Sequence, residues 1–318
     1  MYLGVDLGGI NIAVGLVDEN NQIIHKDSVP TGRLRSFEEI MMDMADLCRK
    51  VTEDAGYQMS DVVSIGIGSP GTPDVKEKKV VYANNLVHFV DVNLEKELQK
   101  YFPGMTVYVE NDANAAAYGE IIAGAAKEFS TAVVVTLGTG VGGGVIIDNK
   151  IYAGFNHAGS EVGHMVIIKD GVPCTCGRNG CFEVYASATA LIRETAETIE
   201  KYPDSVIHSM IDGNPENING KTAFDAAAQN DEAGCEIIRQ YVEYLGTGIS
   251  NLINVFQPEA IVIGGGISKQ GENLLVPLRE YVKKNSYTRG VPESKIMTAK
   301  LGNDAGIIGA AMLWRQAQ

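Results

Sequence analysis

The chain alternates between short apolar runs and longer stretches in which apolar residues recur at every third or fourth position. Runs such as 133–135 and 145–147, each bounded by glycine or polar residues, are typical of buried β-strands. Residues 2–29 show the same strand pattern, with a polar turn at 18–21. From Ser36 the spacing becomes that of an amphipathic helix with Ser36 as its N-cap. This alternation predicts an α/β fold.

Further elements follow from the same rules. Strands are expected at 62–68 and 260–263, and a long apolar helix from about 233 to 256. The segment 202–221 is rich in proline, glycine and asparagine, which indicates a surface connection. The last helix, which ends near Ala311, is rich in small residues and therefore suited to close packing.

The glycine-rich segment 137–144 joins two apolar strands and is typical of a hairpin turn. Glycine permits positive φ angles and lets an anion approach the backbone N–H groups without interference from a Cβ atom. Thr139 adds a hydroxyl group. The segment is therefore a candidate phosphate-binding turn, although a tight hairpin without a ligand explains the same residues.

The glycine turn occurs twice in the chain. Residues 3–9 align with 133–139, and each copy is followed by an apolar strand that ends in glycines, at 63–71 and 260–266. An internal repeat on this scale means two similar domains. Two glycine turns directed at each other would form a cleft for a polyphosphate. The repeat resembles the architecture shared by sugar kinases, heat-shock ATPases and actin, in which two ribonuclease-H-like lobes surround a central cleft.

On this basis we expect a small N-terminal lobe formed by residues 1–117, with the C-terminal helix 303–318 packed back on it. Residues 118–302 would form a larger C-terminal lobe.

Polar residues in loops and at strand ends are candidates for ligand binding. Asn84 and Asn85 offer two adjacent amides, which bind hydroxyl groups well but are also ordinary turn residues. Asn111 and Asp112 follow a strand at its carboxyl end, where burying polar groups is costly unless they are used. Asp112 is either the N-terminal cap of the next helix or a carboxylate directed into the cleft, and the two roles are compatible.

Three of the five cysteines lie in one short loop, Cys174, Cys176 and Cys181, with His164 upstream. An odd number of cysteines without a signal peptide argues against a disulfide framework. Three thiolates and one imidazole supply the ligands of a closed tetrahedral zinc site. Three reduced thiols in a loop remain the alternative. Cys48 lies on the apolar face of its helix and is expected in the core.

The composition supports two ordinary domains with real cores, at 318 residues and 45% apolar content. The 26 basic and 40 acidic residues give a net charge of −14, which repels nucleic acid. No run approaches the roughly 18 apolar residues of a membrane span, and the first strand begins too close to Met1 for a signal peptide. We expect a cytoplasmic protein that binds neither nucleic acid nor membranes.

Taken in order, the motifs of this chain resemble those of bacterial ROK-family sugar kinases, and within that family the glucokinases. The motifs that carry the resemblance lie at 6–9, 110–112, 137–144, 161–164 with the cysteine loop, and 263–266. Because no DNA-binding segment precedes Met1, the repressor branch of the family is not expected.

The resemblance implies a glycolytic enzyme that uses ATP to phosphorylate the 6-hydroxyl of glucose. Asp112 would be the general base, Mg²⁺ would accompany ATP, a structural zinc would order the sugar site, and the protein would be a homodimer. The sugar residues implied are Asn84, Asn85, Asn111, Asp112, Glu161, His164 and Glu183. The nucleotide residues implied are Asp6, Gly8, Gly9, Asn11, Gly138, Thr139, Gly264, Gly265 and Gly266. The zinc ligands implied are His164, Cys174, Cys176 and Cys181, with the second ring nitrogen of His164 left for the sugar.

The chain departs from the family pattern at two positions. Ile10 replaces a threonine after Gly9, which removes a hydroxyl expected near the terminal phosphates and leaves polyphosphate open as a donor. Ser160 replaces a glycine before Glu161. Alternative functions are a kinase for N-acetylmannosamine, N-acetylglucosamine, fructose or allose, a non-catalytic sugar sensor, and an ATPase without a sugar acceptor.

Overall fold

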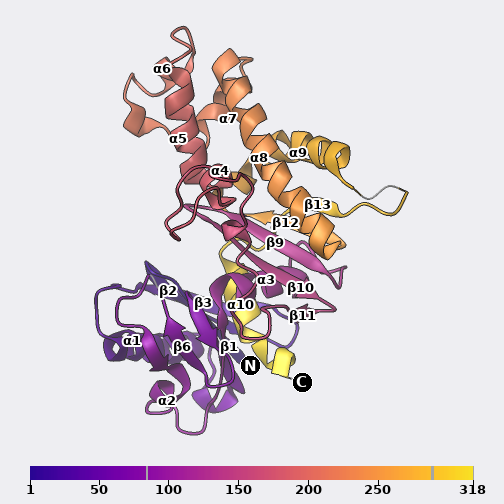
Figure 1. Cartoon of the computed structure of the whole chain (residues 1–318). Helices are drawn as coiled ribbons and strands as arrows, with labels where there is room; N and C mark the ends of the chain where they lie inside the picture. Colours follow the sequence, from indigo (N-terminus) through magenta and orange to yellow (C-terminus); the bar gives the residue numbers. More distant parts are fainter. Residues whose placement is uncertain (84, 288–289, 318) are drawn as a thin grey trace. The chain divides into compact units, whose positions relative to one another are not determined.

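The computed structural model describes residues 1–83, 85–287 and 290–317 (Figure 1). The chain divides into two compact units. The first unit contains Met1–Thr131, Gly144–Ser160 and Lys300–Gln318, and the second contains Ala132–Gly143 and Glu161–Ala299. The boundary expected after residue 117 falls inside helix α3 (Asp112–Ile122), which is continuous. The assignment of functional lobes therefore stays a prediction.

Two five-stranded sheets form the framework, and they have the same strand order. The first sheet has the order β3-β2-β1-β4-β8, with β1 (Tyr2–Leu7), β2 (Asn11–Val17), β3 (Ile23–Pro30), β4 (Ser64–Ser69) and β8 (Thr106–Asn111). The second has the order β11-β10-β9-β12-β13, with β9 (Ala132–Leu137), β10 (Val141–Ile147), β11 (Lys150–Ile151), β12 (Ala260–Gly264) and β13 (Lys295–Thr298). In both sheets the first and fourth strands in chain order run parallel. This common topology confirms the internal repeat.

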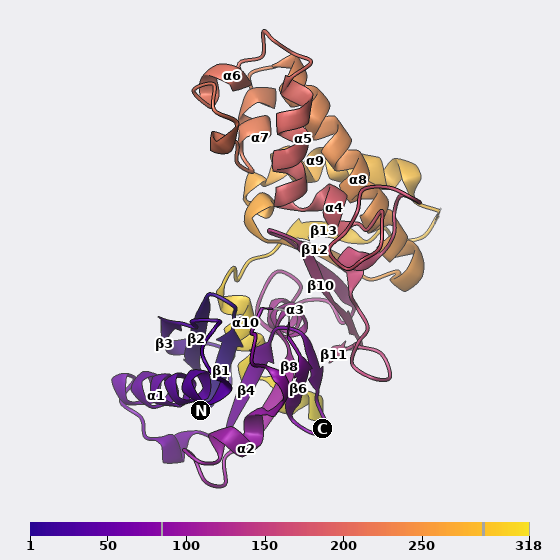
Figure 2. The ribbon, with the colours of Figure 1, turned by 60° about the vertical axis from the view of Figure 1, so that its left-hand side comes forward.

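Smaller elements complete the two units (Figure 2). The first unit adds a three-stranded sheet of β5 (Thr72–Asp74), β6 (Lys79–Tyr82) and β7 (Val90–Asn93), followed by α2 (Leu94–Leu98). The helices of the second unit are α4 (Glu183–Ala186), α5 (Ala188–Ile199), α6 (Ile207–Met210), α7 (Thr222–Ala227), α8 (Glu232–Phe256) and α9 (Glu272–Asn285). The polar segment 202–221 contains the short helix α6 and a 3₁₀ turn, and most of its residues are exposed.

Among the described residues, no helix combines the length and the apolar character that a membrane crossing requires.

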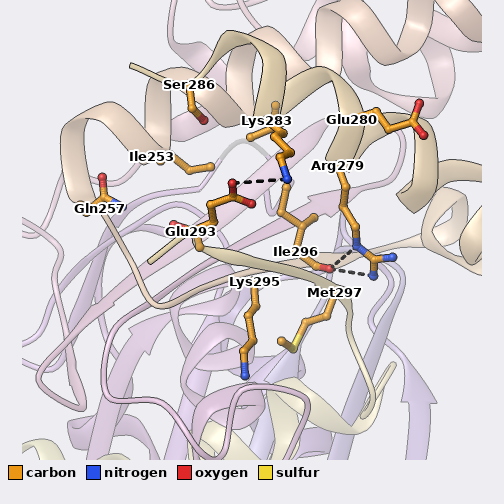
Figure 3. Close-up of a pocket in the computed structure, with 12 residues that line it drawn as sticks. Ile253, Gln257, Arg279, Glu280, Lys283, Ser286, Glu293, Lys295, Ile296 and Met297 are labelled. Atoms are coloured by element: carbon orange, nitrogen blue, oxygen red, sulfur yellow. Dashed lines mark hydrogen bonds and ion pairs between the residues drawn. The ribbon is translucent and has the colours of Figure 1, made fainter. Parts of the chain in front are cut away.

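A groove of about 610 Å³ in the second unit lies along α9 and the segment that leads into β13 (Figure 3). Arg279 fixes this arrangement, because its Nε and Nη2 atoms donate to the Ile296 carbonyl at 3.0 and 2.9 Å. Lys283 lies 3.8 Å from Glu293 across the groove. None of the predicted site residues lines it.

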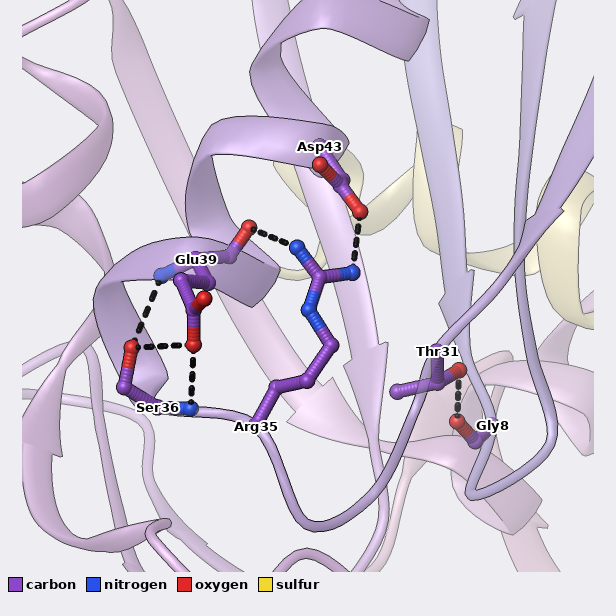
Figure 4. Close-up of polar contacts among 6 residues, drawn as sticks. All are labelled: Gly8, Thr31, Arg35, Ser36, Glu39 and Asp43. Atoms are coloured by element: carbon purple, nitrogen blue, oxygen red, sulfur yellow. Dashed lines mark hydrogen bonds and ion pairs between the residues drawn. The ribbon is translucent and has the colours of Figure 1, made fainter.

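Helix α1 (Phe37–Asp54) begins where the sequence predicts (Figure 4). The Glu39 N–H donates to Ser36 Oγ at 3.3 Å, and the Ser36 N–H donates to Glu39 Oε2 at 2.9 Å. This reciprocal pair is a capping box, which satisfies N–H groups left free at a helix start. Cys48 is fully buried on the apolar face of α1, as predicted.

The first sheet has two different faces. Large apolar residues such as Leu3 and Ile65 belong to the core cluster that includes α1. The opposite face carries Gly4, Gly15 and Gly66, and α10 (Asp304–Ala311) packs against it. A Cβ atom at Gly66 would lie only 1.7 Å from the Ala310 carbonyl oxygen. The absence of side chains at these three positions therefore lets α10 approach the backbone of the sheet.

A buried carboxylate joins α3 to the segment that leads into α10. Glu120 is 1% exposed. Its Oε1 atom accepts from the Leu301 N–H at 2.8 Å, and its Oε2 atom accepts from the Ala125 N–H at 2.8 Å. The backbone N–H of Lys300 donates to both oxygens at 3.1 Å. Backbone N–H groups thus compensate the cost of burying this carboxylate.

Candidate functional site

Asp6 lies near the carboxyl end of β1, next to the start of α10. A Cβ atom at Gly306 would lie 2.8 Å from Asp6 Oδ2, so the backbone of α10 passes close to the carboxylate. Burial raises the pKa of Asp6 from 3.8 to about 6, and the negative charge of Asp112 adds to the effect. A divalent cation at this carboxylate would favour its ionised form.

The first glycine turn follows β1 directly. The Gly8 N–H donates to the Asn11 carbonyl at 2.9 Å, which closes the turn. The Gly8 carbonyl accepts from Thr31 Oγ1 at 2.7 Å (Figure 4). Thr31 is fully buried, so the turn is fixed from inside the unit. Local sequence patterns do not identify Thr31, because this contact joins residues 23 positions apart in the chain.

Asn85, one of the predicted sugar residues, lies next to Gly9 of the first turn. A Cβ atom at Gly9 would lie 3.1 Å from the Cβ atom of Asn85. Asn84, its predicted neighbour in the site, lies outside the described residues. The side chain of Ile10 is 82% exposed at the tip of the turn. It therefore provides an apolar surface where a hydroxyl was expected.

A polar hollow of about 470 Å³ opens beside this turn. Three predicted nucleotide residues line it, Asp6, Gly8 and Asn11. Lys26 also lines it and pairs with Asp304 at the start of α10. Lys26 therefore reaches the hollow as one member of an ion pair, and local sequence patterns do not identify it.

Asn111, and not Asp112, is the N-cap of α3. The Asn111 Oδ1 atom accepts from the Ala113 N–H at 2.9 Å and the Asn114 N–H at 3.2 Å. Asn111 keeps the extended backbone of the strand end, as a cap requires, whereas Asp112 is the first helical residue. The alternative in which Asp112 serves as the cap is therefore wrong. The Asn111 Nδ2 atom donates to the Gly71 carbonyl at 3.1 Å.

Asp112 is held in a largely buried position at the start of α3. Its Oδ1 atom accepts from the Ala113 N–H at 2.8 Å. Burial raises the pKa of this carboxyl group, and the hydrogen bonds oppose the shift. A Cβ atom at Gly68 would lie 3.4 Å from the Asp112 Cα atom, and Gly68 pairs with Asp6 in the sheet. The two carboxylates thus lie in one region of the first unit, which explains their electrostatic coupling.

The carboxylate of Glu110 accepts two hydrogen bonds from residues at the start of α3. It accepts from the Asn111 N–H at 2.9 Å and from Asn114 Nδ2 at 3.0 Å. Burial raises the pKa of Glu110. Glu110 belongs to the motif at 110–112, but no role was predicted for it. The structure shows that its carboxylate orients the residues around Asp112.

The second glycine turn joins β9 to β10, as predicted. Its glycines do not adopt positive φ angles, so the part of the prediction that rests on φ is wrong, whereas access for an anion stays a prediction. They allow close approach instead. A Cβ atom at Gly140 would lie 2.1 Å from Glu183 Oε2, and one at Gly143 would lie 2.7 Å from the Val134 carbonyl oxygen. Gly138 has no atom within 4 Å of its Cβ position, so one side of the turn is open.

The first residues of α5 donate hydrogen bonds to two carbonyl groups of the second turn. The Ala188 N–H donates to the Gly138 carbonyl at 2.8 Å. Thr189 Oγ1 donates to the Thr139 carbonyl at 2.8 Å. Thr189 is exposed, in contrast to Thr31 in the first unit. Both contacts join segments far apart in the chain, and local sequence patterns do not predict them.

The glycines after β12 include one with a required backbone conformation. Gly265 has φ 82°, and a Cβ atom there would lie 2.4 Å from the Leu137 carbonyl oxygen. A side chain is therefore excluded on both grounds. A Cβ atom at Gly266 would lie in open space, and one at Gly264 would make only ordinary van der Waals contacts.

The predicted metal ligands lie together in the second unit. One donor atom from each of His164, Cys174, Cys176 and Cys181 lies within 4.8 Å of the others. Cys174 Sγ is 3.7 Å from His164 Nδ1, and Cys176 Sγ is 3.6 Å from Cys181 Sγ. A tetrahedral zinc site with ordinary bond lengths places its ligand atoms about 3.5 to 3.8 Å apart. The four residues therefore fit a zinc ion.

The thiols of this cluster have different environments. The backbone and side chain of Arg178 lower the pKa of Cys176 to about 6, while burial raises the pKa of Cys181 to about 12. A bound cation would favour the thiolate form of both. Arg178 Nη2 also donates to the His164 carbonyl at 2.9 Å, which fixes the backbone of the fourth ligand.

Glu161 immediately precedes the short 3₁₀ turn Val162–His164, and the His164 N–H donates to its carbonyl at 3.0 Å. The preceding residue, Ser160, has φ 66°, in the region that favours glycine. This explains why a glycine would suit the position. Ser160 Oγ donates to the Tyr152 carbonyl, which helps to hold the conformation.

Comparisons with known proteins agree over the whole chain. The model of the ROK family matches residues 2–317. A glucokinase from Thermotoga maritima is 38% identical over 99% of this chain and 97% of its own length. The crystal structure of a ROK family glucokinase from Streptomyces griseus in complex with glucose and AMPPNP is 36% identical, with a TM-score of 0.80 and 99% of both chains covered. A ROK hexokinase from Thermus thermophilus is 29% identical, with a TM-score of 0.80 over 98% of this chain and 96% of its own. The predicted actin/sugar-kinase architecture is thereby confirmed.

Proposed function

The chain belongs to the ROK family, and on this premise we propose that it is a hexose kinase that transfers the γ-phosphoryl group of ATP to the 6-hydroxyl of glucose. Similarity to glucokinases over the full length, and to a structure that contains glucose and AMPPNP, supports this proposal. The observation that carries it is the buried carboxylate of Asp112, held at the start of α3 near Asp6.

Asp112 is the proposed general base. Phosphoryl transfer has a loose transition state, so the enzyme contributes mainly alignment and electrostatic stabilisation, and the hydroxyl proton is transferred late. The Ala113 N–H fixes the carboxylate, and burial raises its pKa, which makes it a better proton acceptor than an exposed aspartate. Asn111 and Glu110 hold the backbone that presents it.

The first glycine turn and Asp6 form the proposed donor site of the first unit. Asp6 would hold Mg²⁺ through water, and this cation would neutralise phosphate charge. Gly8, Gly9 and Asn11 would approach the phosphates, with Lys26 in the wall of the same hollow. In the second unit, Gly138 and Thr139 would contribute to phosphate binding. The residues proposed for the nucleoside are Gly264, Gly265 and Gly266.

The proposed sugar contacts are Asn85, Asn111, Asp112, Glu161, His164 and Glu183, together with Asn84. Zinc would be held by His164, Cys174, Cys176 and Cys181. Because His164 Nδ1 faces the cysteine cluster, its Nε2 atom remains for a sugar hydroxyl. A metal bound at one ring nitrogen fixes the tautomer and orientation of the imidazole. Zinc would therefore order the sugar site without taking part in the reaction.

Three parts of this proposal rest on the family resemblance and on the sequence. They are the identity of the phosphoryl donor, the oligomeric state and the cellular location of the enzyme. Ile10 removes one hydroxyl near the terminal phosphates, so polyphosphate is tested beside ATP. A cytoplasmic homodimer remains a prediction.

The function is tested by ADP release with Mg²⁺ATP and a panel of hexoses, in a coupled assay. We expect the highest kcat/KM with glucose. Activity only with an N-acetylated sugar, with fructose or with allose would keep the reaction and change the substrate. Failure to release ADP with every hexose, or release that no sugar stimulates, would contradict the proposal. The same panel with polyphosphate identifies the donor.

A further inference from the structure

The metal cluster and α4 are parts of one short segment. Cys181, the last ligand of the cluster, is separated from Glu183, the first residue of α4, by Phe182 alone. Phe182 is fully buried, and a Cβ atom at Gly248 of α8 would lie 2.3 Å from its ring. The aromatic ring thus anchors the segment against α8. Cys181 and Glu183 therefore lie on either side of one buried side chain.

The carboxylate of Glu183 lies between the metal cluster and the second glycine turn. Its Oε2 atom accepts from the Val141 N–H at 3.0 Å. Its Oε1 atom lies 3.9 Å from Sγ of the metal ligand Cys174. A side chain at Gly140 would occupy the space that Oε2 uses, since its Cβ atom would lie 2.1 Å away. The turn is therefore built around this carboxylate.

The same segment makes two further bonds to the turn. Ala188 and Thr189, which lie just after α4, donate to the carbonyls of Gly138 and Thr139. Three hydrogen bonds between the turn and residues 183–189, one donated by Val141 of the turn and two accepted by the turn, therefore fix its conformation. Of the three, the one from Val141 ends on a charged group, and such bonds are the stronger kind.

We propose that Glu183 is a positioning residue that couples the metal cluster to the second glycine turn, so that loss of the metal weakens nucleotide binding even when no sugar is present. This inference rests on the proposed function, because it takes the turn to be a phosphate site. It adds to the proposed sugar contact of Glu183 a second role, which a purely sugar-binding residue would not have.

The first test compares three variants by their affinity for Mg²⁺AMPPNP in calorimetry without sugar. Glu183→Ala removes the acceptor of the Val141 N–H, and we expect affinity to fall at least tenfold, about the loss of one hydrogen bond to a charged group. Glu183→Gln keeps an acceptor oxygen and should stay within about threefold of the wild type. Glu194→Ala on α5 is the matched control and should bind as the wild type does.

Hydrogen exchange gives a second measurement that does not depend on activity. The Val141 amide should exchange faster in Glu183→Ala than in the wild type, while Glu183→Gln should largely retain its protection. A Val141 amide equally protected in Glu183→Ala and the wild type would overturn the inference.

The coupling itself is tested by removing the metal with a chelator. Metal-free wild type should lose nucleotide affinity by about the same factor as Glu183→Ala and regain it on addition of Zn²⁺. Removing the metal from Glu183→Ala should cause little further loss, because coupled effects are not additive. Additive losses, or unchanged nucleotide affinity in Glu183→Ala, would overturn the inference alone. A wild type that binds no nucleotide under any condition would overturn the proposed function and the inference together.

Discussion

The two glycine turns occupy the same position in two sheets of identical strand order, yet their surroundings differ. The first turn is fixed by the buried Thr31 and lies beside the carboxylates Asp6 and Asp112. The second is held by a single carboxylate, that of Glu183, and by the start of α5, next to the metal cluster. The repeated topology therefore provides the same frame twice, and the chemistry depends on what surrounds each turn.

The sheets beneath the turns differ as well. In the first sheet, Gly4, Gly15 and Gly66 on adjacent strands form a patch without side chains, against which α10 packs. In the second sheet, β9 and β12 carry mainly valine, isoleucine and alanine, and almost all of these residues are buried. Strands β9 and β12 of the second sheet thus pack through apolar side chains, and the glycines at which that sheet allows close approach lie on β10.

Gly66→Ala should produce the largest effect on stability. Its new Cβ atom would lie 1.7 Å from the Ala310 carbonyl oxygen, which belongs to backbone and cannot rotate away. We expect the free energy of unfolding to fall by more than about 3 kcal/mol. Gly264→Ala in the second sheet is the control, since its nearest contact is an ordinary 3.4 Å. Denaturant unfolding at the same midpoint for both variants and the wild type would show that the glycine patch is not required.

Asp6→Asn should stabilise the metal-free protein at neutral pH. The folded-state pKa of about 6 lies above the ordinary value of 3.8, so the folded protein binds the proton more tightly than the unfolded chain. The stability that protonated Asp6 contributes is complete below about pH 4, and it is lost as the pH rises through about 6. The neutral asparagine avoids this loss. The difference in unfolding free energy between variant and wild type should therefore grow by up to about 3 kcal/mol between pH 4 and pH 8.

Mg²⁺ provides the control for this prediction, because a cation beside the carboxylate would favour its charged form and reduce the advantage of the variant. Urea unfolding at several pH values measures the difference. A difference that stays constant with pH would contradict the predicted burial effect at Asp6.

The smallest effects are expected from the two threonines that donate to the turns. Thr31→Val leaves the buried side of the first turn without its donor at the Gly8 carbonyl, and should cost about 1 kcal/mol. Thr189→Val removes an exposed donor from the second turn, where water can replace it, and should cost less than about 0.5 kcal/mol. Thermal unfolding of the pair measures both. Equal losses would mean that burial does not distinguish the turns.

Local patterns predicted much of the fold and part of the site. Apolar runs, glycine turns and Ser36 predicted the strands and the start of α1, because each signal acts over a few residues. The metal cluster was predictable because three of its ligands lie in one loop, with His164 a short distance upstream.

Contacts between distant segments could not be predicted from these patterns. Thr31, Lys26 and Thr189 reach their turns or hollow through tertiary packing, and no local spacing identifies such residues. The positive φ angles expected for the glycines of the second turn were wrong for a related reason. Gly140 and Gly143 admit Glu183 and neighbouring backbone, which only the folded structure shows. Asn111 was missed as a cap because adjacent Asn and Asp are equally suited to that role.

The most direct test of the proposed kinase is the transfer of phosphate from ATP to glucose by the wild type and Asp112→Asn under single-turnover conditions. Asp43→Asn on α1 serves as the control for the chemical change. We expect glucose 6-phosphate from the wild type and the control, and a rate about 10³-fold lower in Asp112→Asn, with unchanged AMPPNP affinity and unfolding. A variant that forms the product at the wild-type rate, or a wild type that forms no sugar phosphate, would contradict it.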